Sequence, residues 1–137
     1  MVKPIVRDVF FLSQKSEPAT KEDLSVGHDL MDTLRANRER CVGMAANMIG
    51  IKKNIIIVNM GMLDVVMFNP VLLKADTPYE TEEGCLSLLG GPRKCKRYKT
   101  IKVQFQTLEM KTHTKNFTGW TAQIIQHEID HCNGILI

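Results

Sequence analysis

The chain has 137 residues, of which 44% are hydrophobic and 24% are charged, with a formal net charge of +3. These values are ordinary for a globular protein, and the length predicts one domain, residues 1–137, with a single core. Every apolar run is shorter than the roughly 18–20 residues that cross a bilayer, so we expect no membrane span. The first residues lack the order of a signal peptide, which favours the cytoplasm, and the small charge argues against specific DNA binding.

The first half of the sequence predicts a helix followed by short strands. Thr20 begins a capping-box pattern, and apolar residues then recur at helical spacing, so we expect a helix over about residues 21–37. Residues 55–58 are all β-branched, which is typical of a buried strand. Residues 65–68 predict another strand, which we expect to end at the Asn69-Pro70 pair, with further extended segments after it.

The second half predicts a hairpin and a terminal helix. Apolar and polar residues alternate over residues 101–106, as in a strand with one wet face, and residues 111–117 are its expected partner. Thr118 has the position of an N-cap, and Gly134 that of a helix stop. The last helix should therefore run to about Asn133.

A short basic run occupies residues 93–99, where five of the seven residues are lysine or arginine. Two interpretations stay open. The more common role for so short a run is a solvated loop and strand edge. The other is a patch that contacts RNA on the ribosome.

The most informative stretch is Gln-His-Glu-Ile-Asp-His, which begins at Gln126. On a helix, the four-residue spacing of His127 and His131 stacks both imidazoles on one face, where they can bind one metal ion. Glu128 between them can handle the protons of a water on that metal. The bare histidine pair is as often structural or on the surface, but the intervening glutamate and the helical context favour a metal site.

The third ligand is expected upstream, because only six residues follow His131 in this sequence and none is Asp, Glu or His. This disfavours a conventional metalloprotease, whose third ligand follows the motif. The upstream candidates are the carboxylates, His28, His113, Cys41, Cys85 and Cys95. Cys85 has the best surroundings, because Gly84 lets the backbone approach a bound group and a thiolate forms readily beside a divalent ion. Two imidazoles and one thiolate leave a fourth position open, which is typical of a catalytic site.

Three segments resemble, in order and spacing, the signature motifs of the peptide deformylases. They are Gly-Met-Ala-Ala-Asn-Met-Ile-Gly at residues 43–50, Glu-Gly-Cys-Leu-Ser at 83–87 and Gln-His-Glu-Ile-Asp-His at 126–131. The resemblance covers about residues 22–137. It implies an α+β fold in which antiparallel β-sheets surround a C-terminal helix that carries the His-Glu-x-x-His motif. It also implies a hydrolase that removes the N-formyl group from the initiator methionine of nascent polypeptides.

The resemblance implies a role for each matching residue. Cys85, His127 and His131 would bind one divalent ion, Fe²⁺ above all, with Zn²⁺ or Ni²⁺ able to replace it. Glu128 would act as general base and then give the proton to the leaving amine, while the Leu86 amide would help to stabilise the oxyanion. The residues expected to bind the substrate are Val42, Gly43, Gly84, Arg97, Trp120 and Ile124.

Two residues depart from the family pattern. Met48 stands where the family has a glutamine that donates to the oxyanion, and Cys41 replaces a glycine. A thioether has no donor, and losing one such donor typically costs about 10²–10³ in turnover. One interpretation is a deformylase with reduced or altered activity. The alternative is a homologue that binds metal and peptide N-termini in a regulatory role; Glu128 favours the first, because a binding site needs no base.

Overall fold

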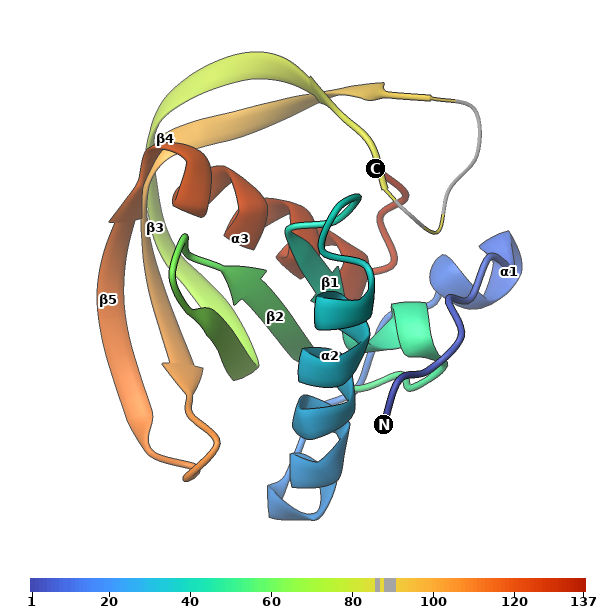
Figure 1. The fold of residues 1–137 in the computed structure, drawn as a ribbon. Helices are drawn as coiled ribbons and strands as arrows, with labels where there is room; N and C mark the ends of the chain where they lie inside the picture. Colours follow the sequence, from blue (N-terminus) through green and yellow to red (C-terminus); the bar gives the residue numbers. More distant parts are fainter. Residues whose placement is uncertain (86, 88–90) are drawn as a thin grey trace.

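The computed structural model describes residues 1–85, 87 and 91–137, and its architecture confirms the expected α+β fold (Figure 1). The helices are α1 (Val9–Leu12), η1 (Lys21–Asp23), α2 (Leu24–Ala36), η2 (Ala46–Ile49) and α3 (Gly119–Cys132). The strands are β1 (Gly43–Ala45), β2 (Ile55–Asn59), β3 (Asp64–Glu83), β4 (Arg93–Gln106) and β5 (Thr112–Thr118). They form a five-stranded antiparallel sheet in the order β1-β2-β3-β4-β5. In the described part of the chain we find no helix with the length and apolar character that a bilayer crossing requires.

The N-terminal helix begins where the capping box predicts. The Thr20 hydroxyl accepts from the Glu22 amide at 3.3 Å, and the Asp23 carboxylate accepts from the Thr20 amide at 2.9 Å. A short 3₁₀ turn then leads into α2, which buries Leu30 and Leu34 against β2 and β3. The predicted helix over residues 21–37 is therefore confirmed.

The expectation that a strand ends at Asn69-Pro70 is wrong. β3 runs through both residues, because a register shift between Phe68 and Val71 accommodates them as a bulge. Asn69 has a φ of 52°, and its side chain holds the bulge by donating to the Ala19 carbonyl at 2.9 Å and to Gln106 at 2.8 Å. Proline is tolerated at a bulge, since no ladder hydrogen bond from its nitrogen is needed there.

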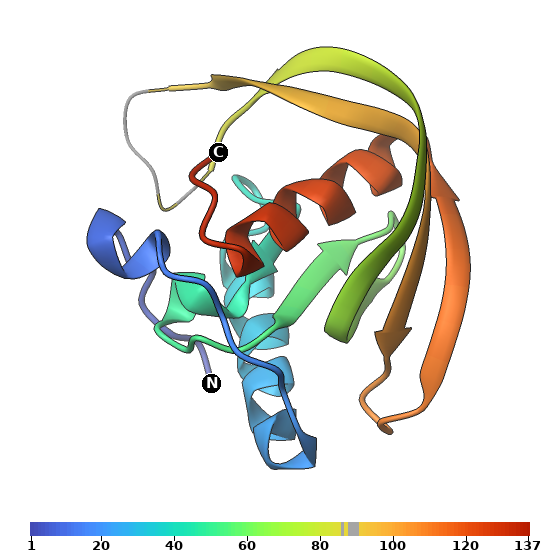
Figure 2. The same ribbon diagram turned by 180° about the vertical axis from the view of Figure 1, so that it is seen from behind.

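Beyond the bulge, the long hairpin of β3 and β4 bends over α3, as Figures 1 and 2 show from opposite sides. β5 pairs with β4 only from Thr100 onward, so the preceding part of β4 lacks a strand on that edge. Gln126 on α3 fills this role: its carboxamide accepts from the Tyr98 amide at 2.9 Å and donates to the Tyr98 carbonyl at 2.8 Å. The hairpin is thereby fixed above the helix, and the end of β3 lies over the predicted metal motif.

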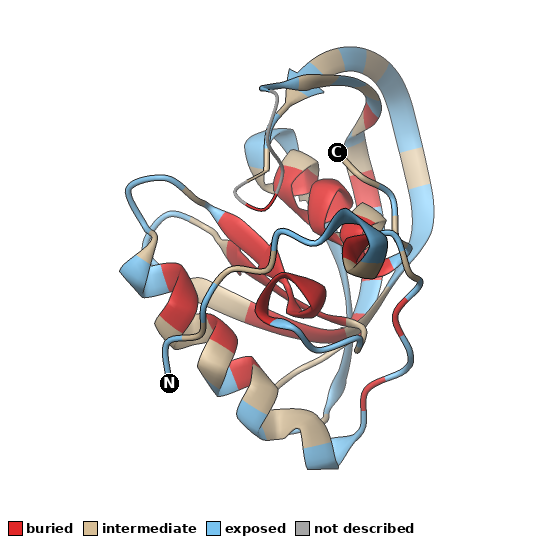
Figure 3. Cartoon of the chain, turned by 90° about the vertical axis from the view of Figure 1, so that its right-hand side faces the viewer, coloured by how far each residue is buried: buried red, intermediate tan, exposed pale blue. Residues whose placement is uncertain are grey.

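α3 packs against β1, β2 and β4, and its middle is buried on all sides, since residues 124–128 are buried without a break (Figure 3). Ala122 and Ile125 pack against β2 and β4, as the apolar stripe predicts. Thr118 is the N-cap residue, as predicted, although its side chain makes no capping hydrogen bond. Gly134 ends the helix as predicted: its φ is 76°, and a Cβ there would clash with the Ser13 carbonyl oxygen.

Candidate active site

Three side chains that can bind a metal meet between the end of β3 and the last turns of α3. The possible ligand atoms of Cys85, His127 and His131 all lie within 4.8 Å of one another. The Nε2 atoms of the two histidines are 3.0 Å apart. Two nitrogens bound tetrahedrally to one ion at about 2.0–2.1 Å would be separated by ~3.3 Å, so the observed spacing needs only a small adjustment. The donor set and its geometry therefore fit a divalent metal such as iron or zinc.

His127 is held by a carboxylate that the sequence interpretation did not assign. Glu83 Oε1 lies 2.7 Å from His127 Nδ1, which leaves the Nε2 atom of the ring for a metal. Arg97 donates to both oxygens of Glu83 and, at 2.7 Å, to Asp130 one turn along α3. Gln123 adds a further hydrogen bond to Glu83 at 2.8 Å. The only sequence signal for this role is the position of Glu83 directly before Gly84 and Cys85.

The charges around this network stabilise a cation at His127. Burial raises the pKa of Glu83, but hydrogen bonds from His127, Arg97 and Gln123 outweigh it and lower that pKa to about 2. For His127 burial acts in the other direction and lowers the pKa, but the hydrogen bonds with Cys85 and Glu83 outweigh it and raise the pKa to about 10. The same acidic neighbours that favour a proton on this ring also favour a metal ion in its place.

His131 is fully buried, and a second long-range contact fixes its backbone. Burial, reinforced by His127, lowers the pKa of His131 to about 3, so its ring is neutral and able to act as a ligand. The Asn47 carboxamide on η2 donates to the His131 carbonyl at 3.0 Å. Asn47 is also fully buried. The helix turn that carries His131 is therefore attached to the first motif.

Glu128 lies beside the possible metal ligands with the properties of a proton acceptor. It is buried, and its Oε1 has no hydrogen-bond partner among the described residues. Burial raises the pKa of Glu128, which His127 partly offsets, to about 7. A Cβ on Gly43 would lie 2.9 Å from Glu128 Oε2, so glycine lets β1 approach this carboxylate closely. The Oε1 atom of Glu128 is thus available to accept a proton.

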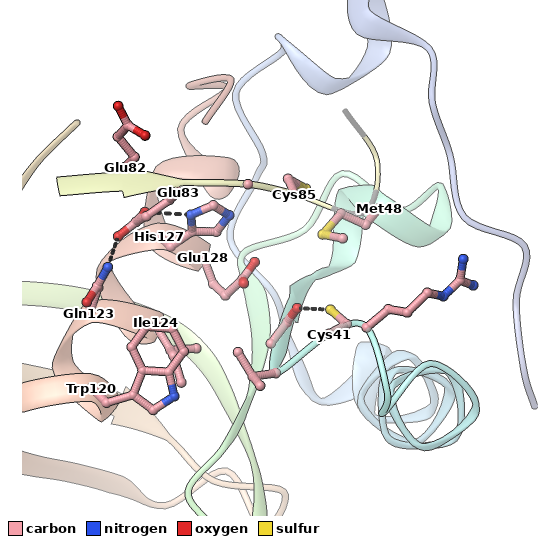
Figure 4. A pocket seen from close by; sticks show the side chains of 14 residues that line it. Cys41, Met48, Glu82, Glu83, Cys85, Trp120, Gln123, Ile124, His127 and Glu128 are labelled. Carbon is pink, nitrogen blue, oxygen red and sulfur yellow. Dashed lines mark hydrogen bonds and ion pairs between the residues drawn. The ribbon is translucent and has the colours of Figure 1, made fainter. Parts of the chain in front are cut away.

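These residues line a cavity between β1, the end of β3 and α3 (Figure 4). Of the residues expected to contact substrate, Val42, Gly43, Gly84, Trp120 and Ile124 line it, together with Met48, Cys85, His127 and Glu128. Arg97 does not line it: its buried side chain pairs with Glu83, which does line the cavity, and with Asp130, so its geometry supports shaping the site rather than touching substrate. The Leu86 amide lies outside the described residues.

Met48 lies at the cavity wall with its sulfur turned to its own backbone. The side chain is 1% exposed, and its Sδ accepts a weak hydrogen bond from the Ala45 amide at 3.5 Å. No N–H or O–H of this side chain can reach into the cavity, because a thioether carries none. Met48 thus lines the cavity with a side chain that has no hydrogen-bond donor, and its expected place at the oxyanion stays a prediction.

A cysteine and two histidines around one point, with a buried carboxylate beside them in an open cavity, are typical of metal-dependent hydrolases. Residues 3–137 match the family model described as polypeptide deformylase. The chain is 59% identical over 137 residues to the peptide deformylase of Clostridium beijerinckii, with all of both chains covered. It is 34% identical over 128 residues to that of Heliobacterium modesticaldum, covering 91% of this chain and 83% of the relative.

Solved structures agree with the sequence relatives. The crystal structure of the Thermotoga maritima peptide deformylase superposes with a TM-score of 0.90 at 30% identity, covering 99% of this chain and 95% of that one. The actinonin-bound class I type b enzyme of Acinetobacter baumannii gives 0.88 at 32% identity, with 99% and 95% covered. The chain belongs to the polypeptide deformylase family and is a metal-dependent hydrolase.

Proposed function

We propose that this chain removes the N-formyl group from the formyl-methionine that begins nascent polypeptides, with one divalent ion held by Cys85, His127 and His131. The observation that carries the proposal is the convergence of these three ligand atoms within 4.8 Å, next to the buried carboxylate of Glu128. Fe²⁺ is the ion that the family resemblance favours, and Zn²⁺ or Ni²⁺ fits the same donors. The enzyme is proposed to act in the cytoplasm as a single domain.

The ion, when bound, supplies a Lewis acid that polarises the formyl carbonyl. Glu128 takes a proton from the attacking water and delivers it to the nitrogen as the bond between the formyl carbon and that nitrogen breaks. The products are formate and a peptide with a free α-amine. A pKa near 7 suits a carboxylate that must first accept and then donate a proton.

The cavity walls fit an extended peptide that begins with methionine. β1 is an edge strand whose outer side faces the cavity, and Gly84 lies across from it, so a peptide can add as a strand between them. Trp120 and Ile124 on α3 offer an apolar slot for the methionine side chain. His127 contributes the end of this slot nearest to the proposed metal.

In the proposed reaction, Met48 limits the turnover rate. The oxyanion of the transition state needs donors, and Met48 offers none, which leaves the ion and the proposed Leu86 amide. Turnover should therefore be slower than a glutamine at this position would allow. The same residue favours the alternative function, a homologue that binds metal and peptide N-termini without efficient hydrolysis, whereas the free oxygen of Glu128 opposes it.

The basic run is a weaker candidate for a partner surface. Across the hairpin, Lys94 is in register with Glu82 and Lys96 with Glu80. Each of these lysines thus faces an acid on the neighbouring strand, which reduces the local positive potential. Contact with the ribosome stays a prediction.

Formate release tests the proposed function directly. The protein is loaded with Fe²⁺ without oxygen and given formyl-Met-Ala-Ser, and a Glu128→Ala variant loaded in the same way is the control. We expect metal-dependent formate release from the native chain that the variant lacks. Equal, background-level release from both would reject the hydrolase and leave the binding alternative.

A further inference from the structure

The carbonyl of Gly43 is the hydrogen-bonding group that β1 presents to the cavity. The preceding carbonyl, of Val42, accepts from the Asn59 amide at 2.8 Å and so faces β2. Successive carbonyls along a strand point to opposite edges, which turns the Gly43 carbonyl away from β2 and toward the cavity. Gly43 therefore offers the acceptor that an added peptide strand would use.

This acceptor already has a partner within the chain. The Cys41 thiol donates to the Gly43 carbonyl oxygen, with the sulfur 2.8 Å away, as the dashed line in Figure 4 shows. A carbonyl oxygen has two lone pairs, but Cys41 and Gly43 both line the cavity. The sulfur thus occupies space on the side from which a peptide approaches.

The thiol remains a donor throughout the ordinary pH range. Burial, with a contribution from Glu128, raises the pKa of Cys41 to about 12. A thiol with so high a pKa is a poor nucleophile, which argues against a covalent role for this side chain. Its contribution is the hydrogen bond and the space that the sulfur fills.

We propose that Cys41 weakens peptide binding by occupying the Gly43 carbonyl, so that an incoming peptide N–H must displace the thiol. The inference rests on the proposed function, because it assumes that the peptide adds to the edge of β1. Cys41 acts through Gly43 and is not catalytic. It sets the affinity for the peptide backbone and leaves the chemical step at Glu128 unaffected.

Removing the thiol should therefore tighten binding without changing the chemistry. Cys41→Ala frees the carbonyl and keeps the Cβ, whereas Cys41→Ser keeps a donor of similar reach. The net worth of one hydrogen bond predicts about a two- to tenfold lower KM and Kd for Cys41→Ala, with kcat unchanged. Cys41→Ser should stay within about twofold of the native chain, because its hydroxyl also donates.

Two measurements on the metal-loaded full chain test this. Trp120 is the single tryptophan and lines the cavity, so its fluorescence reports the binding of the peptide Met-Ala-Ser. Steady-state formate release from formyl-Met-Ala-Ser gives KM and kcat. Thr114→Ala removes an exposed hydroxyl on β5, outside the cavity, and is the control that should change neither quantity.

Lower Kd and KM in Cys41→Ala, with native values in Cys41→Ser and Thr114→Ala, would support the proposal. Unchanged or higher Kd in Cys41→Ala would overturn it, even if the native chain releases formate. If the native chain releases no formate, the proposed hydrolysis fails, but the Trp120 titration still decides whether Cys41 competes for the peptide.

Discussion

The two walls of the cavity are built from different chemistry. The wall formed by α3 and the end of β3 is supported by a network of charged and polar groups in which Glu83 bonds His127, Arg97 and Gln123. The wall formed by β1 and η2 offers two sulfur side chains. Cys41, just before β1, donates to the Gly43 carbonyl, and Met48 Sδ accepts a weak hydrogen bond from the Ala45 amide.

The two walls would serve different parts of the hydrolysis: one holds the metal and moves the proton, and the other faces the substrate. The charged wall fixes the groups that would hold a metal and move a proton, and strong hydrogen bonds specify their positions. In the proposed function the sulfur wall, Cys41 and Met48, faces the peptide backbone and the formyl oxygen, and Met48 has no donor to offer that oxygen. We infer that metal binding is well preserved in this chain and that transition-state stabilisation is the weaker part.

The largest effect should come from removing a ligand on the charged wall. His131→Ala takes away a buried imidazole, and among the described residues no further ligand joins Cys85 and His127 at this point, so we expect bound metal and formate release to fall to background. Metal content after gel filtration and formate release are the measurements, with His113→Ala on the exposed strand β5 as control. Stoichiometric metal in His131→Ala would contradict the assignment.

The next largest effect concerns the proton rather than the metal. Glu128→Gln keeps the size of the side chain but cannot accept the proton, so kcat should fall by about 10²–10⁴. Metal content should stay unchanged, which separates this residue from the ligands. Glu109→Gln, at an exposed site paired with Lys111, is the matched control. A kcat for Glu128→Gln within threefold of native would exclude Glu128 as the base.

The sulfur wall should respond in the opposite direction. Met48→Gln restores an amide donor beside the reacting oxygen, and kcat should rise by as much as about 10²–10³. Met48→Leu, which has a similar volume and no donor, should leave kcat near the native value. Formate release under saturating peptide is the measurement. An unchanged or lower kcat in Met48→Gln would mean that another group already supplies the missing hydrogen bond.

The smallest of these effects should come from Glu83, which hydrogen-bonds the proposed ligand His127. Glu83→Gln keeps a side chain near His127 Nδ1 but removes the charge that orients the ring and favours a cation there. Metal affinity should fall by about 10–100-fold, measured by competition with a chelator. Glu80→Gln, on the exposed side of the same strand, should leave it unchanged. Equal affinities in the two variants would show that Glu83 has a structural role alone.

Local signals were enough to predict much of the fold. The capping box at Thr20, the alternation over residues 101–106 and the glycine at Gly134 each depend on near neighbours in sequence, and each matches the structure. The passage of β3 through Pro70 was not predictable in this way. It depends on Asn69 bonding the Ala19 carbonyl and Gln106, 50 and 37 residues away.

The same distinction applies to the site. The histidine pair follows from helical spacing, and Cys85 from its glycine neighbour and the family motif. The carboxylate beneath His127 and the Asn47 contact to the His131 carbonyl join residues 44 and 84 positions apart. Nothing in the local sequence pairs them: the bend of the β3–β4 hairpin over α3 brings Glu83 to His127, and the packing of η2 against α3 brings Asn47 to His131.

Cobalt titration of the native chain tests the central claim, that Cys85, His127 and His131 together bind one ion. Co²⁺ bound to a thiolate gives a charge-transfer absorption that oxygen and nitrogen ligands alone do not produce. We predict saturation at one Co²⁺ per chain with this absorption, and its loss in Cys85→Ser. Binding without the charge-transfer absorption, or an unchanged spectrum in Cys85→Ser, would contradict the proposed metal centre.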